Sequence, residues 1–118
     1  MMILVAGPYR SGTNDDPELI HRNTELMQRM ALSVYETGHL PVLGEWFALP
    51  LIATAGSRVL GDEIFTRLFH PVATRLLGHC DAVLRVGGAS QGSDEMVRLA
   101  VEQGKPVYFS IEEIPVLP

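Results

Sequence analysis

Two glycine-rich loops contain the side chains best suited to hold a small molecule. The first, residues 7–16, has the sequence GPYRSGTNDD, and its glycines let a ligand approach the backbone closely. In it, Arg10 can form a two-pronged contact with a phosphate or carboxylate, and Ser11 and Thr13 add hydroxyl donors. The second, residues 87–93, has the sequence GGASQGS and precedes a predicted helix, whose first N–H groups suit an anion. The alternative for each loop is a polar turn without a ligand.

The second loop departs from two familiar phosphate-binding motifs. It lacks the lysine of a nucleoside-triphosphate loop, and the spacing of Gly87, Gly88 and Gly92 does not match the dinucleotide fingerprint. Both departures disfavour nucleoside triphosphate hydrolysis and nicotinamide cofactors. Together the two loops predict one pocket for a phosphate- or ribose-bearing small molecule.

Four short apolar segments predict the strands that position these loops. They lie at residues 2–6, 39–43, 81–86 and 107–110, and such runs are typical of strands buried in a parallel sheet. Helices alternating with these strands predict right-handed crossovers and a single-domain α/β fold over residues 1–118, with three Rossmann- or flavodoxin-like layers. For the four strands we expect the order 2-1-3-4. In such a sheet, ligands bind at the carboxyl edge where the strand order reverses, which is where both loops lie.

Apolar residues at helical spacing predict three helices between the strands. The first begins at the segment DDPE, residues 15–18, which supplies a capping carboxylate and a proline for the first turn, and it ends at Gly38. The second begins at Asp62, and Pro71 in its middle predicts two short helices or one bent helix. The third is capped by Ser93.

Residues 44–61 are the hardest part of the chain to interpret. The segment 46–52 is either a helix broken by Pro50 or a lid over the site. Trp46 and Phe47 could stack on a base, although aromatic residues in an apolar segment more often belong to a core or a dimer interface.

The composition and charge exclude several classes of partner. With a net charge of -5 and no cluster of Lys or Arg, the chain has no electrostatic footprint for a nucleic-acid polymer. The longest apolar stretch, residues 47–55, is interrupted by Pro50 and is far shorter than the roughly 20 residues that cross a bilayer. No basic segment or cleavage site precedes the first strand, so we expect a cytoplasmic protein that does not bind membranes.

Neither the cysteine nor the histidines indicate a metal site or a disulfide. Cys80 is the only cysteine and lies at the apolar end of a predicted helix, so we interpret it as structural, with a reactive thiol as the alternative. The histidines lack the spacings of zinc-binding helices, so no metal is expected. They are His21, His39, His70 and His79.

The tail, residues 112–118, is short and is assigned no role in the fold.

With both loops placed on this fold, the chain resembles the nucleoside 2-deoxyribosyltransferase superfamily, which includes deoxynucleoside 5'-monophosphate N-glycosidases. The resemblance spans most of the chain and is carried by ILVAGPYRSG at residues 3–12 and by CDAVL, SQGS, Ala100 and GKPV within residues 80–107. It implies cleavage of the bond between a nucleobase and a (deoxy)ribose by a glutamate that attacks the anomeric carbon. It also implies no cofactor and a homodimer or higher homo-oligomer, for which residues 46–52 are a candidate interface.

The resemblance also implies roles for individual residues. Tyr9 and Arg10 would line the sugar and base pocket, and Ser90 and Gly92 would hold a 5'-phosphate or 5'-hydroxyl. Asp81, just before the third strand, matches a position that is commonly acidic in the family. The expected substrate-binding residues are Gly7, Tyr9, Arg10, Ser11, Gly12, Gly88, Ser90, Gly92 and Ser93.

One position departs from the family pattern. The family nucleophile lies four residues after the glycine matched by Gly92, and Met96 at that position cannot usefully attack an anomeric carbon. Glu95 is one residue away, which is a rotation of about 100° on a helix, so it reaches the pocket only if the helix begins with an altered turn. Glu95 and Asp94 have a plainer interpretation as acids that favour the positive end of the helix dipole.

The expected catalytic residues are therefore Glu95, Asp94 and Asp81. Glu45, after the second strand, could be a second catalytic acid, but a solvated loop residue is the simpler interpretation. The leading functional hypothesis is N-glycosidic cleavage or (deoxy)ribosyl transfer on a nucleoside or nucleoside 5'-monophosphate. The alternatives are a nucleotide-binding or sensing domain that lacks the nucleophile, favoured by Met96, and a phosphoribohydrolase-like Rossmann protein.

Overall fold

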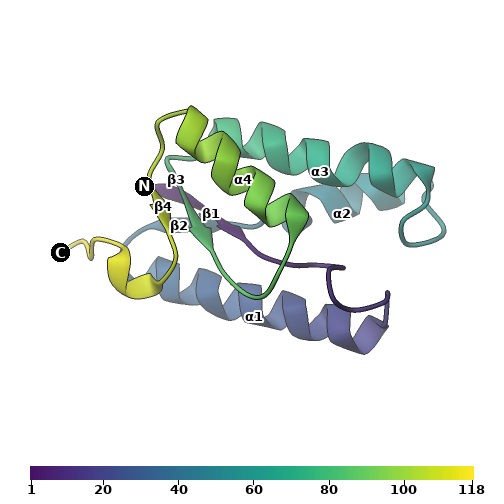
Figure 1. The fold of residues 1–118 in the computed structure, drawn as a ribbon, viewed down its shortest axis with the longest axis horizontal. Helices are drawn as coiled ribbons and strands as arrows, with labels where there is room; N and C mark the ends of the chain where they lie inside the picture. The colour runs from purple at the N-terminus through teal and green to yellow at the C-terminus, as the bar shows by residue number, and fades with distance from the viewer.

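A four-stranded parallel sheet forms the centre of the structure, a computed structural model that describes residues 1–118 (Figure 1). Its strands are β1 (Met2–Ala6), β2 (Leu40–Val42), β3 (Ala82–Arg85) and β4 (Val107–Tyr108). All pairings are parallel and the strand order is β2-β1-β3-β4. The prediction of a three-layer Rossmann-like α/β fold with strand order 2-1-3-4 is therefore confirmed.

Helices cover both faces of the sheet. One face carries α1 (Pro17–Glu36) and the short 3₁₀ helix η1 (Ile111–Glu113), and the other carries α3 (Glu63–Gly78) and α4 (Gln91–Glu102) (Figure 1). The helix α2 (Gly44–Thr54) packs on α3. None of these helices combines the length and the apolar character needed to cross a bilayer.

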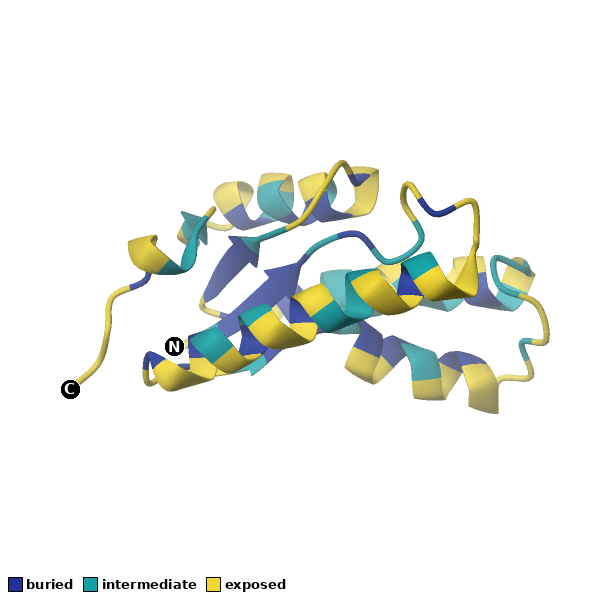
Figure 2. Ribbon diagram, turned by 90° about the horizontal axis from the view of Figure 1, so that it is seen from below, coloured by how far each residue is buried: buried dark blue, intermediate teal, exposed yellow.

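Alternating residues of β1 supply the two cores. Ile3 and Val5 pack against α1, whereas Leu4 and Ala6 pack beneath α3 and α4, because successive strand residues point to opposite faces of a sheet. Figure 2 shows the consequence, with the central strands β1 and β3 mostly buried and the outward side of α1 exposed. The end of β1 is thus held rigidly from both sides, and the first glycine-rich loop leaves from that end.

The prolines inside two helices do not end them. Pro71 lies within α3 and Pro50 lies within α2, and each helix continues past its proline. Of the two alternatives expected for residues after Asp62, two short helices are therefore wrong and a single helix is observed. A proline removes one backbone hydrogen bond, and the burial of Phe65 before Pro71 and of Leu76 after it holds the two halves of α3 in place.

The C-terminal tail has a role in the fold that the sequence did not indicate. Ile114 is 3% exposed and belongs to the core beneath α1. The N–H of Leu117 donates to the Thr37 carbonyl at 2.9 Å. The buried His39 ring contacts the Pro115 carbonyl at 2.7 Å through Nε2. The tail therefore packs on the end of α1, and the earlier assignment of no fold role is wrong.

Asp62 organises the segment that leads into α3. Its carboxylate accepts hydrogen bonds from the N–H of Phe65 and the hydroxyl of Ser57, both at 2.9 Å, and from the N–H groups of Arg58 and Val59. These hydrogen bonds, that of Phe65 above all, lower the pKa of Asp62 to about 2. The capping carboxylate therefore stabilises the fold most where it is ionised.

We expect Asp62→Ala to lower the melting temperature, and the loss to shrink as the pH falls. The carboxyl of the folded protein has a pKa below its ordinary value, so its contribution is complete above about pH 4 and disappears as the pH falls through about 2. Thermal unfolding at pH 6, 4 and 2.5, followed by circular dichroism, measures this change. Glu63→Ala, at the neighbouring exposed acid, is the control. A difference that stays constant from pH 6 to 2.5 would contradict the capping role.

Candidate functional site

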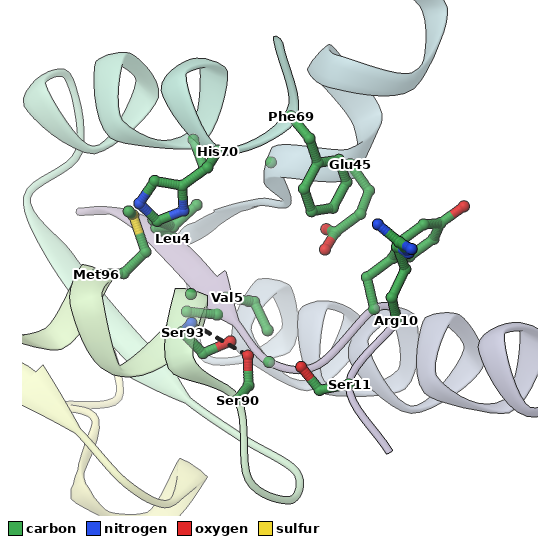
Figure 3. Close-up of a pocket in the computed structure, with 16 residues that line it drawn as sticks. Leu4, Val5, Arg10, Ser11, Glu45, Phe69, His70, Ser90, Ser93 and Met96 are labelled. Carbon is green, nitrogen blue, oxygen red and sulfur yellow. Dashed lines mark hydrogen bonds between the residues drawn. The ribbon is translucent and has the colours of Figure 1, made fainter. Parts of the chain in front are cut away.

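A cavity of about 270 Å³ lies at the carboxyl end of β1 (Figure 3). Its walls come from β1 and the loop after it, from the first turns of α2 and α4, and from the middle of α3. Both glycine-rich loops reach it, so Arg10 and Ser90 face a shared space. Of the expected substrate-binding residues, those that line the cavity are Gly7, Tyr9, Arg10, Ser11, Ser90, Gly92 and Ser93.

Two of the expected binding glycines do not line the cavity. Gly12 has a φ of +75° and no neighbouring atom within 4 Å of the position a Cβ would take, so it serves the turn. Gly88 is equally open, and its carbonyl accepts a hydrogen bond from Nη2 of Arg85 at 2.8 Å. Both glycines therefore shape the loops without lining the cavity.

The first turn of α4 forms one wall of the cavity. Ser90 is the N-cap, and its Oγ accepts a hydrogen bond from the Ser93 N–H at 3.2 Å. The prediction that Ser93 caps this helix is therefore wrong, because the helix begins three residues earlier. The N–H groups of a first turn have no partner within the helix, and Gly92, in that turn, lines the cavity. This wall can therefore bind an anion through its backbone and its hydroxyls.

Arg10 lies at the rim of the cavity and is held there by three contacts. Its guanidinium forms a two-pronged ion pair with Asp15, with both distances 2.8 Å, and lies 5.3 Å from the centre of the Phe65 ring. A Cβ on Gly61 would lie 2.5 Å from Nη2, so a side chain there would displace the guanidinium. The hydrogen bond between the pair raises the pKa of Arg10 and lowers that of Asp15. Arg10 is thus charged and already paired.

An aromatic surface lines the side of the cavity that faces α3. The rings of Tyr9 and Phe69 have their centres 5.2 Å apart, and Phe69 stacks on Phe65 at 4.8 Å. Tyr9 and Phe69 both line the cavity. Trp46 and Phe47, which we expected to be core, interface or base-stacking residues, are 44% and 45% exposed on α2 and do not line it. The expectation that they belong to a core is wrong.

Glu45 is the only carboxylate that lines the cavity. It is the second residue of α2 and is 8% exposed, so the interpretation as a solvated loop residue is wrong. Figure 3 shows its carboxyl group directed into the cavity beside the ring of Phe69. Burial raises the pKa of Glu45 to about 7, and a hydrogen bond from its own backbone N–H offsets only part of that rise. The carboxyl group can therefore give or take a proton near neutrality.

The structure does not bring the three expected catalytic carboxylates into the cavity. Glu95 pairs with Arg98, whose Nε donates to Oε2 at 2.9 Å, and this hydrogen bond lowers the pKa of Glu95. Asp94 is exposed and pairs with Arg85 at 3.1 Å. Asp81 accepts a hydrogen bond from the Met2 N–H at 2.7 Å, next to the start of β1 and at the opposite edge of the sheet from the cavity.

The regular start of α4 explains why Glu95 is outside. With Ser90 as the cap, no altered turn compensates for the 100° rotation between neighbouring residues. Met96 therefore faces the cavity, at 3% exposure, and also packs in the core with Leu77 and Ala100. The position at which the family resemblance implies a nucleophile thus holds a thioether.

Phe69 and His70 are lining residues that the sequence did not point to as part of the site. Both come from the middle of α3, where Phe69 fits the apolar pattern of a core helix and His70 has no metal-like spacing. His70 lies across from the first turn of α4, and its Nδ1 is 3.6 Å from the position a Cβ on Gly92 would take. Only the packing of α3 beside α4 reveals their role.

The structure contains no group of three or more His, Cys, Asp or Glu side chains that could hold a metal ion.

No protein-family model matches the chain, and no curated protein sequence matches it.

Proposed function

We propose that the cavity binds a nucleoside or a nucleoside 5'-monophosphate, and that the chain acts as a binding or sensing domain. The observation that carries this proposal is the convergence of both glycine-rich loops on one cavity, with Arg10 and Ser90 on its walls. The volume of about 270 Å³ lies just below the range of typical ligand pockets, roughly 300–1,000 Å³. Such a space suits one nucleotide better than a dinucleotide.

The distribution of polar and aromatic groups indicates how such a ligand lies. A 5'-phosphate fits the first turn of α4, where Ser90, Gly92 and Ser93 face His70. The base fits the opposite side, against the ring of Phe69 and near Glu45 (Figure 3). The sugar then lies over the end of β1.

The carboxylates support binding without a covalent intermediate. Glycosyl transfer through a glycosyl-enzyme needs a nucleophile at the anomeric carbon, and Met96 occupies the corresponding wall. Glu95 is engaged by Arg98 outside the cavity. This arrangement favours the non-catalytic alternative over a retaining glycosidase.

Hydrolysis of the N-glycosidic bond is the second candidate, and the buried Glu45 favours it. A carboxyl group with a pKa of about 7 can protonate the departing base and then take a proton from the water that attacks the anomeric carbon. This route needs no covalent intermediate, so Met96 does not exclude it.

Self-association belongs to the same proposal. Trp46, Phe47 and Leu51 of α2 are 44%, 45% and 53% exposed, and large apolar side chains on one exposed helix favour burial against another chain. This surface supports the expected homo-oligomer.

Titration calorimetry with the ribo- and deoxyribonucleoside monophosphates, paired with chromatography for free base, separates these possibilities. We expect at least one nucleotide to bind with a Kd below about 1 mM and to remain intact. Free base that disappears in Glu45→Gln, but persists in the control Glu63→Gln, would establish hydrolysis. No binding of any of these nucleotides would overturn the proposed function.

A further inference from the structure

Glu45 is a buried carboxyl group with no cation to neutralise it. It faces the aromatic side of the cavity at 8% exposure, and no salt bridge involves it. The one guanidinium that lines the same cavity, that of Arg10, is taken by both oxygens of Asp15. A carboxylate in such surroundings is disfavoured against the neutral acid.

The other titratable groups around the cavity do not supply a compensating charge. Tyr9 lines the same wall, and burial, followed by the charge of Glu45, raises its pKa, so it is neutral. His70 lines the cavity from α3. From α4, only uncharged side chains line the cavity, because Glu95 pairs outside it with Arg98. The strand β1 contributes only apolar residues.

The protonation state of a carboxyl group decides which base edge it can bind. The neutral acid presents one hydroxyl donor and one carbonyl acceptor side by side, whereas the carboxylate presents only acceptors. Adenine, like cytosine, has an amino donor beside a ring nitrogen that accepts, so it matches the neutral acid and repels the second oxygen of a carboxylate. Guanine has two adjacent donors, its ring N–H and its amino group, and these match the carboxylate.

We propose that Glu45 recognises the base as a neutral carboxylic acid, so that the cavity holds a base with an amino donor beside a ring acceptor, such as adenine, only while this carboxyl group carries its proton. The inference rests on the proposed function, because it assigns the base to the side of the cavity formed by Phe69 and Glu45. It adds a class of base and a dependence on pH to that function.

The test is titration calorimetry with adenosine and guanosine between pH 6 and 8.5, because nucleosides avoid the ionisation of a phosphate. The pKa of Glu45 is about 7, so we expect adenosine affinity to fall about 30-fold over this range while guanosine affinity does not fall. In Glu45→Gln the amide donates and accepts at every pH, so adenosine affinity is expected to become flat. This flat profile is a signature that a merely structural role would not produce.

His70→Asn is the matched control, because histidine is the other side chain that commonly changes charge near neutrality. The fall in adenosine affinity between pH 6 and 8.5 should persist in this variant, even where its affinity at a given pH differs from that of the wild type. A flat adenosine profile in the wild type, or a fall that disappears in His70→Asn, would overturn the role of Glu45 but leave the proposed function standing. Absence of binding by nucleosides and by AMP at every pH would overturn both. If Glu45→Gln does not fold, the wild-type and His70→Asn profiles still decide the question.

Discussion

Replacing Glu45 with glutamine is expected to change the pH dependence of stability more than any other single substitution of an ionisable residue. Glu45→Gln changes the free energy of unfolding by an amount that depends on pH. This change should be about 3 kcal/mol more stabilising at pH 8.5 than at pH 4. The pKa of Glu45 is raised by burial from 4.5 to about 7. The folded state therefore keeps a proton that the unfolded state has already released, and the wild type loses stability as the pH rises from about 4.5 through 7.

Urea denaturation at pH 4, 6 and 8.5 measures this effect. Glutamine has nearly the same shape and carries no charge to desolvate, so the variant escapes the loss at high pH. Glu63→Gln, at an exposed acid in the first turn of α3, is the matched control and should show no comparable change. A Glu45→Gln effect of the same size at pH 4 and 8.5 would show that Glu45 is not buried as described.

A negative charge at Gly92 is expected to abolish most of the affinity for a nucleotide. Gly92→Asp places a carboxylate in the first turn of α4, where the proposed 5'-phosphate lies. A Cβ there meets only His70, at 3.6 Å, and an acid in a first turn favours the helix, so the variant should fold. Repulsion between the two anions should weaken AMP binding at least about 30-fold, which corresponds to ~2 kcal/mol.

Two controls separate charge from shape in this experiment. Gly92→Asn has the same size without the charge, and Gln91→Asp adds the charge to an exposed neighbour that does not line the cavity. Adenosine has no phosphate, so its affinity should change little in Gly92→Asp. Equal losses for AMP and adenosine, or an equal effect of Gln91→Asp, would contradict the placement of the phosphate.

The sheet could be predicted from the sequence because its signals are local. The apolar run Met2–Ala6 is closed by Gly7 and Pro8 and coincides with β1. Asp16 before Pro17 marks the start of α1, and its side chain accepts a hydrogen bond from the Glu18 N–H at 2.9 Å. Right-handed crossovers limit the possible strand orders, and the expected order 2-1-3-4 is the one observed. The same reasoning placed both glycine-rich loops at one edge of the sheet.

The errors concern residues whose surroundings are set by distant parts of the chain. Glu45 follows a strand, which suggests a loop, but α2 begins there and packs against Phe65 of α3 through Ala48 and Ile52. The sequence signal that could have indicated a buried Glu45 is that it is a single acid within an otherwise apolar segment. Ile114 lies in a proline-containing tail, and only its contact with the core beneath α1 reveals its role.

The candidate site could be predicted in part. The backbone loops were found because glycines and hydroxyl side chains leave a recognisable pattern, and most of the expected binding residues line the cavity. The expected catalytic acids do not line the cavity. Glu95, for example, is separated by a rotation of about 100° on α4 from the wall that Met96 occupies. Phe69 and His70 have no local pattern that distinguishes them from other residues of an amphipathic helix.

The most direct test of the central claim is an amide proton–nitrogen correlation spectrum recorded during titration with AMP. If the cavity at the end of β1 is the binding site, the largest shifts will come from Gly7, Ser11, Glu45 and Gly92, and they will follow one saturable binding curve. Shifts confined to the outer face of α1, or no shifts at millimolar AMP, would contradict the account.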